Sequence, residues 1–242
     1  MAEKTLEEMR QAVAEIREKM AAAAREAGRD PAAVQLCAAC KTRTAQTIAA
    51  SAALPIDVFG ENHVQELCAN YDAGAYCGKP SHFIGHLQTN KIKKVLGRAS
   101  LIQSVDSEHL LLAIEKEAAK AGIVQDILLE INAGGEKQKS GFLLKEFPRI
   151  VEEMADYPAV RVRGLMTVPP IGRKKGDNCR YFQKIRRIAV DITAQKYDNI
   201  FMDFLSMGMT DDFEDAIACG STMVRIGTAI FGPRNYAPVK SD

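Results

Sequence analysis

The sequence lacks an excess of charge, a long hydrophobic run and a basic, apolar leader. Its 32 Lys and Arg residues nearly balance 31 Asp and Glu residues, for a formal charge of +1. Proteins that bind nucleic acids or membrane surfaces need a clustered basic excess, so we expect neither partner. The longest stretch without a charged residue, 44–56, has 13 residues, and a membrane span needs roughly 18 or more. Because the first residues are acidic and polar, we expect no secretory signal and a cytoplasmic protein.

A metal site is not expected either, although six cysteines are present, at positions 37, 40, 68, 77, 179 and 219. In a reduced compartment these thiols are expected to stay free. Cys37 and Cys40 have a C-x-x-C spacing, but residues three apart in a strand face opposite sides. His82 and His86 are four apart, and no matching second pair follows either motif. We therefore predict no bound metal.

The N-terminal segment predicts an amphipathic helix over about residues 4–27 that ends at Gly28. Its apolar positions recur every three or four residues, with charged residues between them: Leu6, Met9, Val13, Ile16 and Met20.

After this helix, short apolar runs alternate with helical patterns. The predicted strands are Leu36–Cys40, Asp57–Phe59, His82–Gly85, Leu101–Ser104, Asp126–Asn132, Val160–Met166, Phe201–Ser206 and Met223–Ile226. The predicted helices lie near Ala45–Leu54, Val64–Tyr71, Thr89–Leu96, Glu108–Ala121, Lys145–Met154, Arg180–Thr193 and Asp212–Ala218. Strands separated by helical crossovers form parallel sheets, so this alternation predicts an α/β fold.

Eight alternating units favour a single-domain (β/α)₈ TIM barrel over about residues 34–232, with an extra N-terminal helix, in one domain of residues 1–242. No Pro-, Gly- or Ser-rich linker divides the chain. The alternative, an open doubly wound sheet, normally carries a G-x-G-x-x-G turn after its first strand, where this chain has Lys41-Thr-Arg.

In a TIM barrel, function lies at the C-terminal ends of the strands, where Lys41 closes the first one. By alternation Lys41 shares a face with Cys37 and Ala39, which points into the barrel mouth. Desolvation among small apolar neighbours favours the neutral amine that forms a Schiff base with an aldehyde. The alternative is a lysine that extends outward into solvent from the strand end.

The last two predicted strands end in motifs that suit a phosphate. Ser206-Met-Gly-Met-Thr210 offers a hydroxyl and backbone N–H groups before a helix, and Gly227-Thr228 offers a second set. Barrels often bind phosphate after strands seven and eight, although ordinary turns can also have such sequences. A ligand with an aldehyde for Lys41 and a phosphate for these loops is pyridoxal 5′-phosphate (PLP).

Seven motifs in order, from about residue 34 to Phe231, make the chain resemble the pyridoxal phosphate homeostasis protein family. They are Ala39-Cys-Lys-Thr, Phe59-Gly-Glu-Asn, His82-Phe-Ile-Gly-His-Leu-Gln, Lys139-Ser-Gly-Phe, Arg163-Gly-Leu-Met-Thr, Leu205-Ser-Met-Gly-Met and Val224-Arg-Ile-Gly-Thr. The resemblance implies a fold-type III PLP-binding barrel, similar to the N-terminal barrel of alanine racemases.

The resemblance also implies the cofactor contacts. Lys41 would carry PLP as a covalent aldimine, and Asn62 would line the pocket beside the ring. The phosphate would be held by Ser206, Gly227 and Thr228.

Arg225, on the inward face by alternation, would meet the pyridine nitrogen, as in the similar racemase barrels. A guanidinium can only donate a hydrogen bond, so it leaves that nitrogen unprotonated and makes the ring a poor electron sink. Two residues depart from the family pattern, Cys40 where Ser is common and His63 where Tyr is common. We expect a structural role for Cys40 and no functional role for His63.

The resemblance therefore implies a non-catalytic protein that binds PLP and serves vitamin B6 homeostasis, with PLP-dependent apo-enzymes as acceptors; we expect a monomer. The alternative is a PLP-dependent racemase, but such racemases add a β-domain that supplies a tyrosine acid/base. Eleven residues follow Phe231, so that base would have to be a residue such as Tyr71, Tyr76 or Tyr236. Two basic segments, Lys91–Arg98 and Arg173–Lys175, are expected to be solvated surfaces rather than partner or anion sites.

Overall fold

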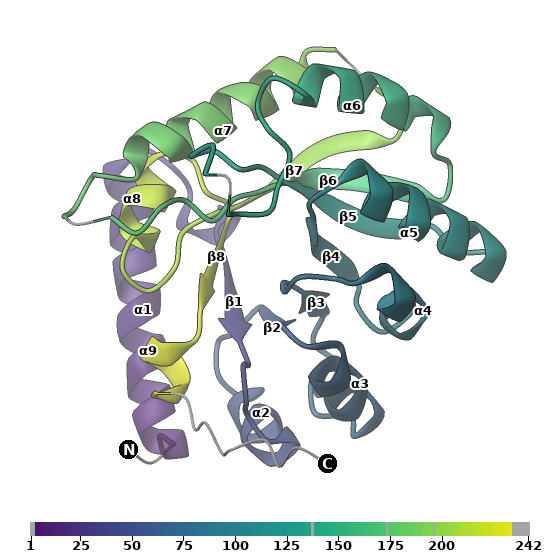
Figure 1. The fold of residues 1–242 in the computed structure, drawn as a ribbon. Coiled ribbons are helices and arrows are strands. Elements are labelled where there is room, and N and C mark those ends of the chain that lie inside the picture. The colour runs from purple at the N-terminus through teal and green to yellow at the C-terminus, as the bar shows by residue number, and fades with distance from the viewer. Residues whose placement is uncertain (1–2, 137, 173, 196, 234–242) are drawn as a thin grey trace.

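The computed structural model describes residues 3–136, 138–172, 174–195 and 197–233. Its core is a closed barrel of eight parallel strands in the order β1 to β8, which confirms the predicted TIM barrel (Figure 1). The strands are β1 (Gln35–Ala39), β2 (Val58–Glu61), β3 (Ser81–Phe83), β4 (Leu101–Val105), β5 (Gln125–Glu130), β6 (Val160–Met166), β7 (Ile200–Ser206) and β8 (Met223–Ile226).

Helices cover the outside of the barrel. They are α1 (Leu6–Glu26), α2 (Ala45–Ser51), α3 (Val64–Asp72), α4 (Ile92–Val95), α5 (Glu108–Ala121), α6 (Phe147–Glu153), α7 (Cys179–Thr193), α8 (Phe213–Ala218) and α9 (Thr228–Phe231). Short 3₁₀ helices are η1 (Pro31–Ala33), η2 (Thr89–Lys91) and η3 (Met154–Asp156). Among the described residues, no helix has both the length and the apolar character that a membrane span needs.

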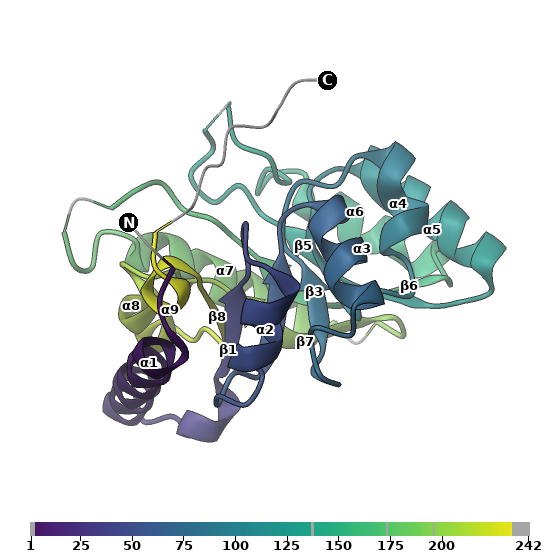
Figure 2. The ribbon, with the colours of Figure 1, turned by 90° about the horizontal axis from the view of Figure 1, so that it is seen from below.

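The N-terminal helix α1 begins at a capping box, in which Thr5 and Glu8 each accept a backbone N–H of the other. Its apolar positions Met9, Val13, Ile16 and Met20 are buried, as their spacing predicts, whereas Leu6, the first position of the predicted face, is exposed. Figures 1 and 2 show α1 beside α8 and α9 on one side of the barrel, with α3, α4 and α5 on the opposite side. The apolar face of α1 thus closes the barrel surface next to β8.

The barrel interior contains two apolar clusters. Cys37, Val58 and Met223 form one cluster, and Leu101, Leu128 and Met166 form another, with Phe204 packed against both. Cys40 instead belongs to the outer core between strands and helices, so Cys37 and Cys40 lie on opposite faces of β1, as predicted. Because all strands are parallel, their C-terminal ends share one mouth, which lies at the top of Figure 2.

Several element boundaries differ from the predicted ones. The predicted helix Thr89–Leu96 is η2 followed by α4, and α6 begins at Phe147 because Pro148 suits only the first helical turn. Helix α9, over Thr228–Phe231, was not predicted because four residues are too few to show helical periodicity.

Glu61 is a buried carboxyl group between β2 and α3, and its ionisation should affect the stability of the fold. It is fully buried, and its Oε1 accepts hydrogen bonds from Asn70 and Tyr76. Burial raises the pKa of Glu61 from 4.5 to about 7, so the folded protein binds this proton more tightly than the unfolded chain. The free energy of unfolding should therefore fall as the pH rises from about 5 to about 8, by up to roughly 3 kcal/mol for this group.

We expect Glu61→Gln to flatten this fall, measured by urea unfolding across that range. Burial also raises the pKa of Glu130 to about 7, so part of the pH dependence should remain. Glu7→Gln, at an exposed position of α1, is the control that should leave the wild-type curve unchanged. Parallel curves for Glu61→Gln and the wild type would contradict the prediction.

Candidate functional site

A cavity of about 440 Å³ lies at the barrel mouth and collects five of the six residues predicted for a cofactor site. Those five are Lys41, Asn62, Arg225, Gly227 and Thr228. The other lining residues are Ala39, Arg43, Ile84, Val168, Met209, Thr210 and Asp211. They come from the C-terminal ends of strands far apart in sequence, so the closed barrel assembles the cavity.

Lys41 lies just beyond the end of β1 and is half-buried. The N–H of Cys40 still donates to the carbonyl of Gly60 on β2, which fixes the chain up to the lysine. The next residue, Thr42, has a left-handed backbone with φ of 59°, which is uncommon outside glycine. The chain therefore turns sharply after Lys41 and leaves this side chain at the rim of the cavity.

Asn62 follows β2 and contributes an unsatisfied acceptor. Its Oδ1 is buried and has no hydrogen-bond partner among the described residues. Buried acceptors of this kind are uncommon and costly, because the atom has lost its contact with water. A ligand that donates a hydrogen bond would satisfy it.

Gly85 positions the backbone of Asn62. A Cβ atom at residue 85 would lie 2.0 Å from the carbonyl oxygen of Asn62, which no real side chain tolerates. The absence of a side chain at this glycine therefore lets the chain segments after β2 and β3 approach each other beside the cavity.

Gly227 and Thr228 follow β8 on the other side of Lys41. A Cβ at Gly227 would lie 3.0 Å from the carbonyl oxygen of Ala39, so the small residue permits close contact between the ends of β8 and β1. Thr228 is the first residue of α9, where helix geometry leaves N–H groups without partners inside the helix. These N–H groups and the Thr228 hydroxyl can donate hydrogen bonds at the cavity.

Arg225 is buried in the barrel interior and reaches the cavity from below. Its Nη1 donates to the carbonyl and hydroxyl oxygens of Ser206, at 2.7 and 2.6 Å, and its Nη2 donates to the carbonyl of Thr167 at 2.9 Å. Burial lowers the pKa of Arg225, and the nearby carboxyl of Glu130 opposes that shift. An arginine in proteins keeps its proton, so the cavity has a fixed cationic donor at its base.

Ser206 is the predicted site residue that the structure does not bring to the cavity. It is fully buried, and its hydroxyl donates to Oε1 of Gln103 at 2.6 Å while accepting from Arg225. The phosphate contact predicted for Ser206 stays a prediction. Thr210, from the same motif, does line the cavity.

Other lining residues were not among the predicted site residues, and two of them had a visible signal. By strand alternation Ile84 shares a face with His82, and Thr210 is the last residue of the motif Ser206-Met-Gly-Met-Thr. Arg43 had none, because its place depends on contacts distant in sequence: Nη2 donates to the carbonyl of Gly232, and the guanidinium stacks over Phe231.

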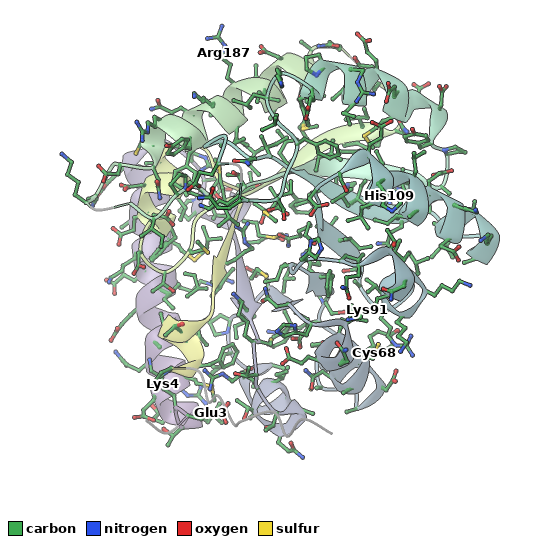
Figure 3. The ribbon with its side chains drawn as sticks, in the orientation of Figure 1. Glu3, Lys4, Cys68, Lys91, His109 and Arg187 are labelled. Carbon is green, nitrogen blue, oxygen red and sulfur yellow. The ribbon has the colours of Figure 1, made fainter. Side chains whose placement is uncertain are left out.

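Of the remaining candidates, those that the structure describes do not line the cavity. His63 is the exposed N-cap residue of α3, and His86 pairs with Asp106, with Nδ1 and Oδ2 3.1 Å apart. In the basic segment Lys91–Arg98, Lys91 lines a shallow hollow with Cys68, both labelled in Figure 3. Arg173 and Tyr236 lie outside the described residues, whereas Lys174 and Lys175 line a neighbouring hollow.

Comparison with known proteins adds independent findings. The family model for the alanine racemase N-terminal domain matches residues 11–235. The pyridoxal phosphate homeostasis protein of Aquifex aeolicus is 41% identical over 219 residues, covering 90% of this chain and 95% of that protein. Its counterpart in Escherichia coli K12 is 36% identical, covering 93% and 96% of the two chains. PipY of Synechococcus elongatus with PLP bound superposes with a TM-score of 0.77 at 29% identity, covering 90% and 100%.

Gly85→Ala tests the close approach at Asn62. The added methyl group overlaps a backbone oxygen, so the strand ends must shift, at a cost of about 2 kcal/mol or more. We expect the Tm to fall by roughly 4–8 °C in a thermal unfolding scan. Gly172→Ala is the matched control, because its nearest new contact is 3.4 Å and its Tm should stay at the wild-type value. Equal Tm values for the two variants would contradict the proposed constraint.

Proposed function

The chain belongs to the pyridoxal phosphate homeostasis proteins of the alanine racemase N-terminal domain family, and on that premise we propose that it binds PLP through Lys41 and serves PLP homeostasis. The observation that carries the proposal is the single cavity that brings Lys41, Asn62, Arg225, Gly227 and Thr228 together. The C-terminal ends of β1, β2 and β8 supply these residues, as expected of a functional site at a barrel mouth.

The residues present fit PLP. Bound PLP supplies an aldehyde that condenses with an amine, next to a phenolic hydroxyl, and Lys41 provides the amine at the cavity. The orphaned Oδ1 of Asn62 suits a ligand hydroxyl as donor. Gly227 and Thr228 offer neutral donors for a phosphate, and we retain Ser206 as a proposed contributor to that end of the site.

Arg225 is compatible with a carrier, although the similar racemase barrels share this arginine, so it does not separate the two functions. A guanidinium at the pyridine nitrogen donates a hydrogen bond and keeps its own proton, so it does not turn the ring into a strong electron sink. Loss of an α-proton from an amino acid would then be poorly stabilised. We propose a non-catalytic protein that holds PLP reversibly and passes it to other amines, with PLP-dependent apo-enzymes as acceptors, acting as a cytoplasmic monomer.

The racemase alternative needs a second acid/base at the site. Tyr71 is exposed and lies next to Arg98, and Tyr76 is buried against Glu61 on the outer side of β2. Among the described residues, no tyrosine lines the cavity. This arrangement favours the carrier.

Lys41→Ala tests the attachment point. Purified wild-type protein incubated with PLP should show an absorption band at the edge of the visible range, and borohydride reduction should fix the cofactor on the peptide that contains Lys41. The variant should lose the band and the fixed mass, because no amine remains at that place in the cavity. Lys93→Ala, an exposed lysine outside the cavity, is the control that should keep both. A band that persists in Lys41→Ala, with the fixed mass on another lysine, would refute the assignment.

Deuterium exchange tests the absence of catalysis. PLP-loaded protein incubated with L-alanine and other L-amino acids in deuterated water should leave the α-hydrogens unexchanged, because a ring whose nitrogen is not protonated stabilises the loss of an α-proton poorly. Mass spectrometry of the amino acids measures this. Exchange at enzymatic rates that disappears in Lys41→Ala would establish the racemase alternative instead.

A further inference from the structure

Four side chains form a continuous hydrogen-bonded chain across the barrel interior below the cavity. Arg225 on β8 donates to the hydroxyl of Ser206 on β7 at 2.6 Å, and that hydroxyl donates to Oε1 of Gln103 on β4, also at 2.6 Å. Nε2 of Gln103 lies 2.8 Å from Nδ1 of His82 on β3. All four residues are buried, and only Arg225 lines the cavity.

The chain has one consistent direction. Arg225 can only donate, so the Ser206 oxygen accepts from it and the single hydroxyl hydrogen is left for Gln103. The amide of Gln103 then donates from Nε2, which is also 3.1 Å from the sulfur of Met223, a weak acceptor. His82 must accept at Nδ1, and this requires a neutral ring. Burial lowers the pKa of His82 to about 3, in agreement with that requirement.

Gln103 thereby determines the orientation of the Ser206 hydroxyl toward Arg225. While Oε1 accepts the hydroxyl hydrogen, a lone pair of the Ser206 oxygen faces the guanidinium. Without that acceptor, the buried hydroxyl must turn toward another acceptor, because an unsatisfied buried donor is costly. The lone pairs of the Ser206 oxygen turn with it, which weakens one of the three hydrogen bonds that hold the guanidinium.

Arg225 retains donors for a ligand. A guanidinium has five N–H groups, and the hydrogen bonds to Ser206 and Thr167 use three of them. The other two belong to a residue at the cavity wall. The hydrogen bonds to Ser206 and Thr167 fix the guanidinium, and they thereby determine the direction of the two remaining N–H groups.

We infer that Gln103 is a positioning residue for PLP, which acts through Ser206 to hold the Arg225 guanidinium at the cavity without touching the cofactor itself. The inference rests on the proposed function, because it assigns Arg225 to the pyridine nitrogen. It distinguishes Gln103 from buried polar residues that only stabilise the fold.

The test compares Gln103→Met with Gln125→Met. Gln125 is also a buried strand glutamine, but it bonds the backbone carbonyls of Ala99 and Asp126 instead of a chain that leads to Arg225. Two quantities are measured for each: the Kd of the apoprotein for PLP, and the midpoint pH of the visible absorption band of the loaded protein. Wild-type protein is titrated alongside.

We expect Gln103→Met to raise the Kd about tenfold, as loss of a hydrogen bond to a charged group implies. The midpoint pH should rise, because a cation held less firmly near the ring opposes protonation of the lysine linkage less. Gln125→Met should change neither. If Gln103→Met fails to fold, Gln103→Asn, one methylene too short to bridge Ser206 and His82, should show the same two changes.

Unchanged Kd and midpoint in Gln103→Met or Gln103→Asn would overturn the inference, as would equal changes in Gln125→Met. A wild-type protein that shows no visible band with PLP would instead refute the proposed function, so the two failures are distinguishable.

Discussion

Pairing of β8 with β1 is the constraint on which the site depends. The register aligns Arg225 with Cys37 and Ile226 with Ala38, so the residues after both strands emerge together at the barrel mouth. Lys41, which follows β1, thereby meets Gly227 and Thr228 in one cavity. A shift of one residue would turn Arg225 from the interior to the helix layer, because side chains alternate between the faces of a strand.

The buried cation at the base of the cavity explains the polar layer of the interior. A guanidinium removed from water requires acceptors, and β6 and β7 provide them through Thr167 and Ser206. Ser206 in turn requires Gln103, and Gln103 requires a neutral His82. The barrel interior therefore combines the apolar cluster of Cys37, Val58 and Met223 with the polar chain of Arg225, Ser206, Gln103 and His82.

The alternation of strands and helices was predictable because it repeats along the chain. Helix α1 is an example, because the spacing of its apolar residues predicted the face that packs on the barrel. The boundaries were less predictable. Strands β2 and β3 are three or four residues long, and their ends depend on pairing with neighbours, which local patterning does not record. Within the site, the phosphate contact of Ser206 stays a prediction from its motif and the family resemblance, whereas the hydrogen bonds of its hydroxyl with Arg225 and Gln103 depend on residues distant in sequence.

The sequence by itself determined the class of fold, the strand that precedes Lys41 and the inward face that carries Arg225, because strand periodicity and turn residues are local properties. Tertiary structure alone decided which strand ends share a cavity, that Asn62 keeps an unsatisfied acceptor there, and that Gln103, 122 positions before Arg225 in the sequence, takes part in holding it. These outcomes follow from barrel closure, which places residues distant in the chain within hydrogen-bond reach of one another.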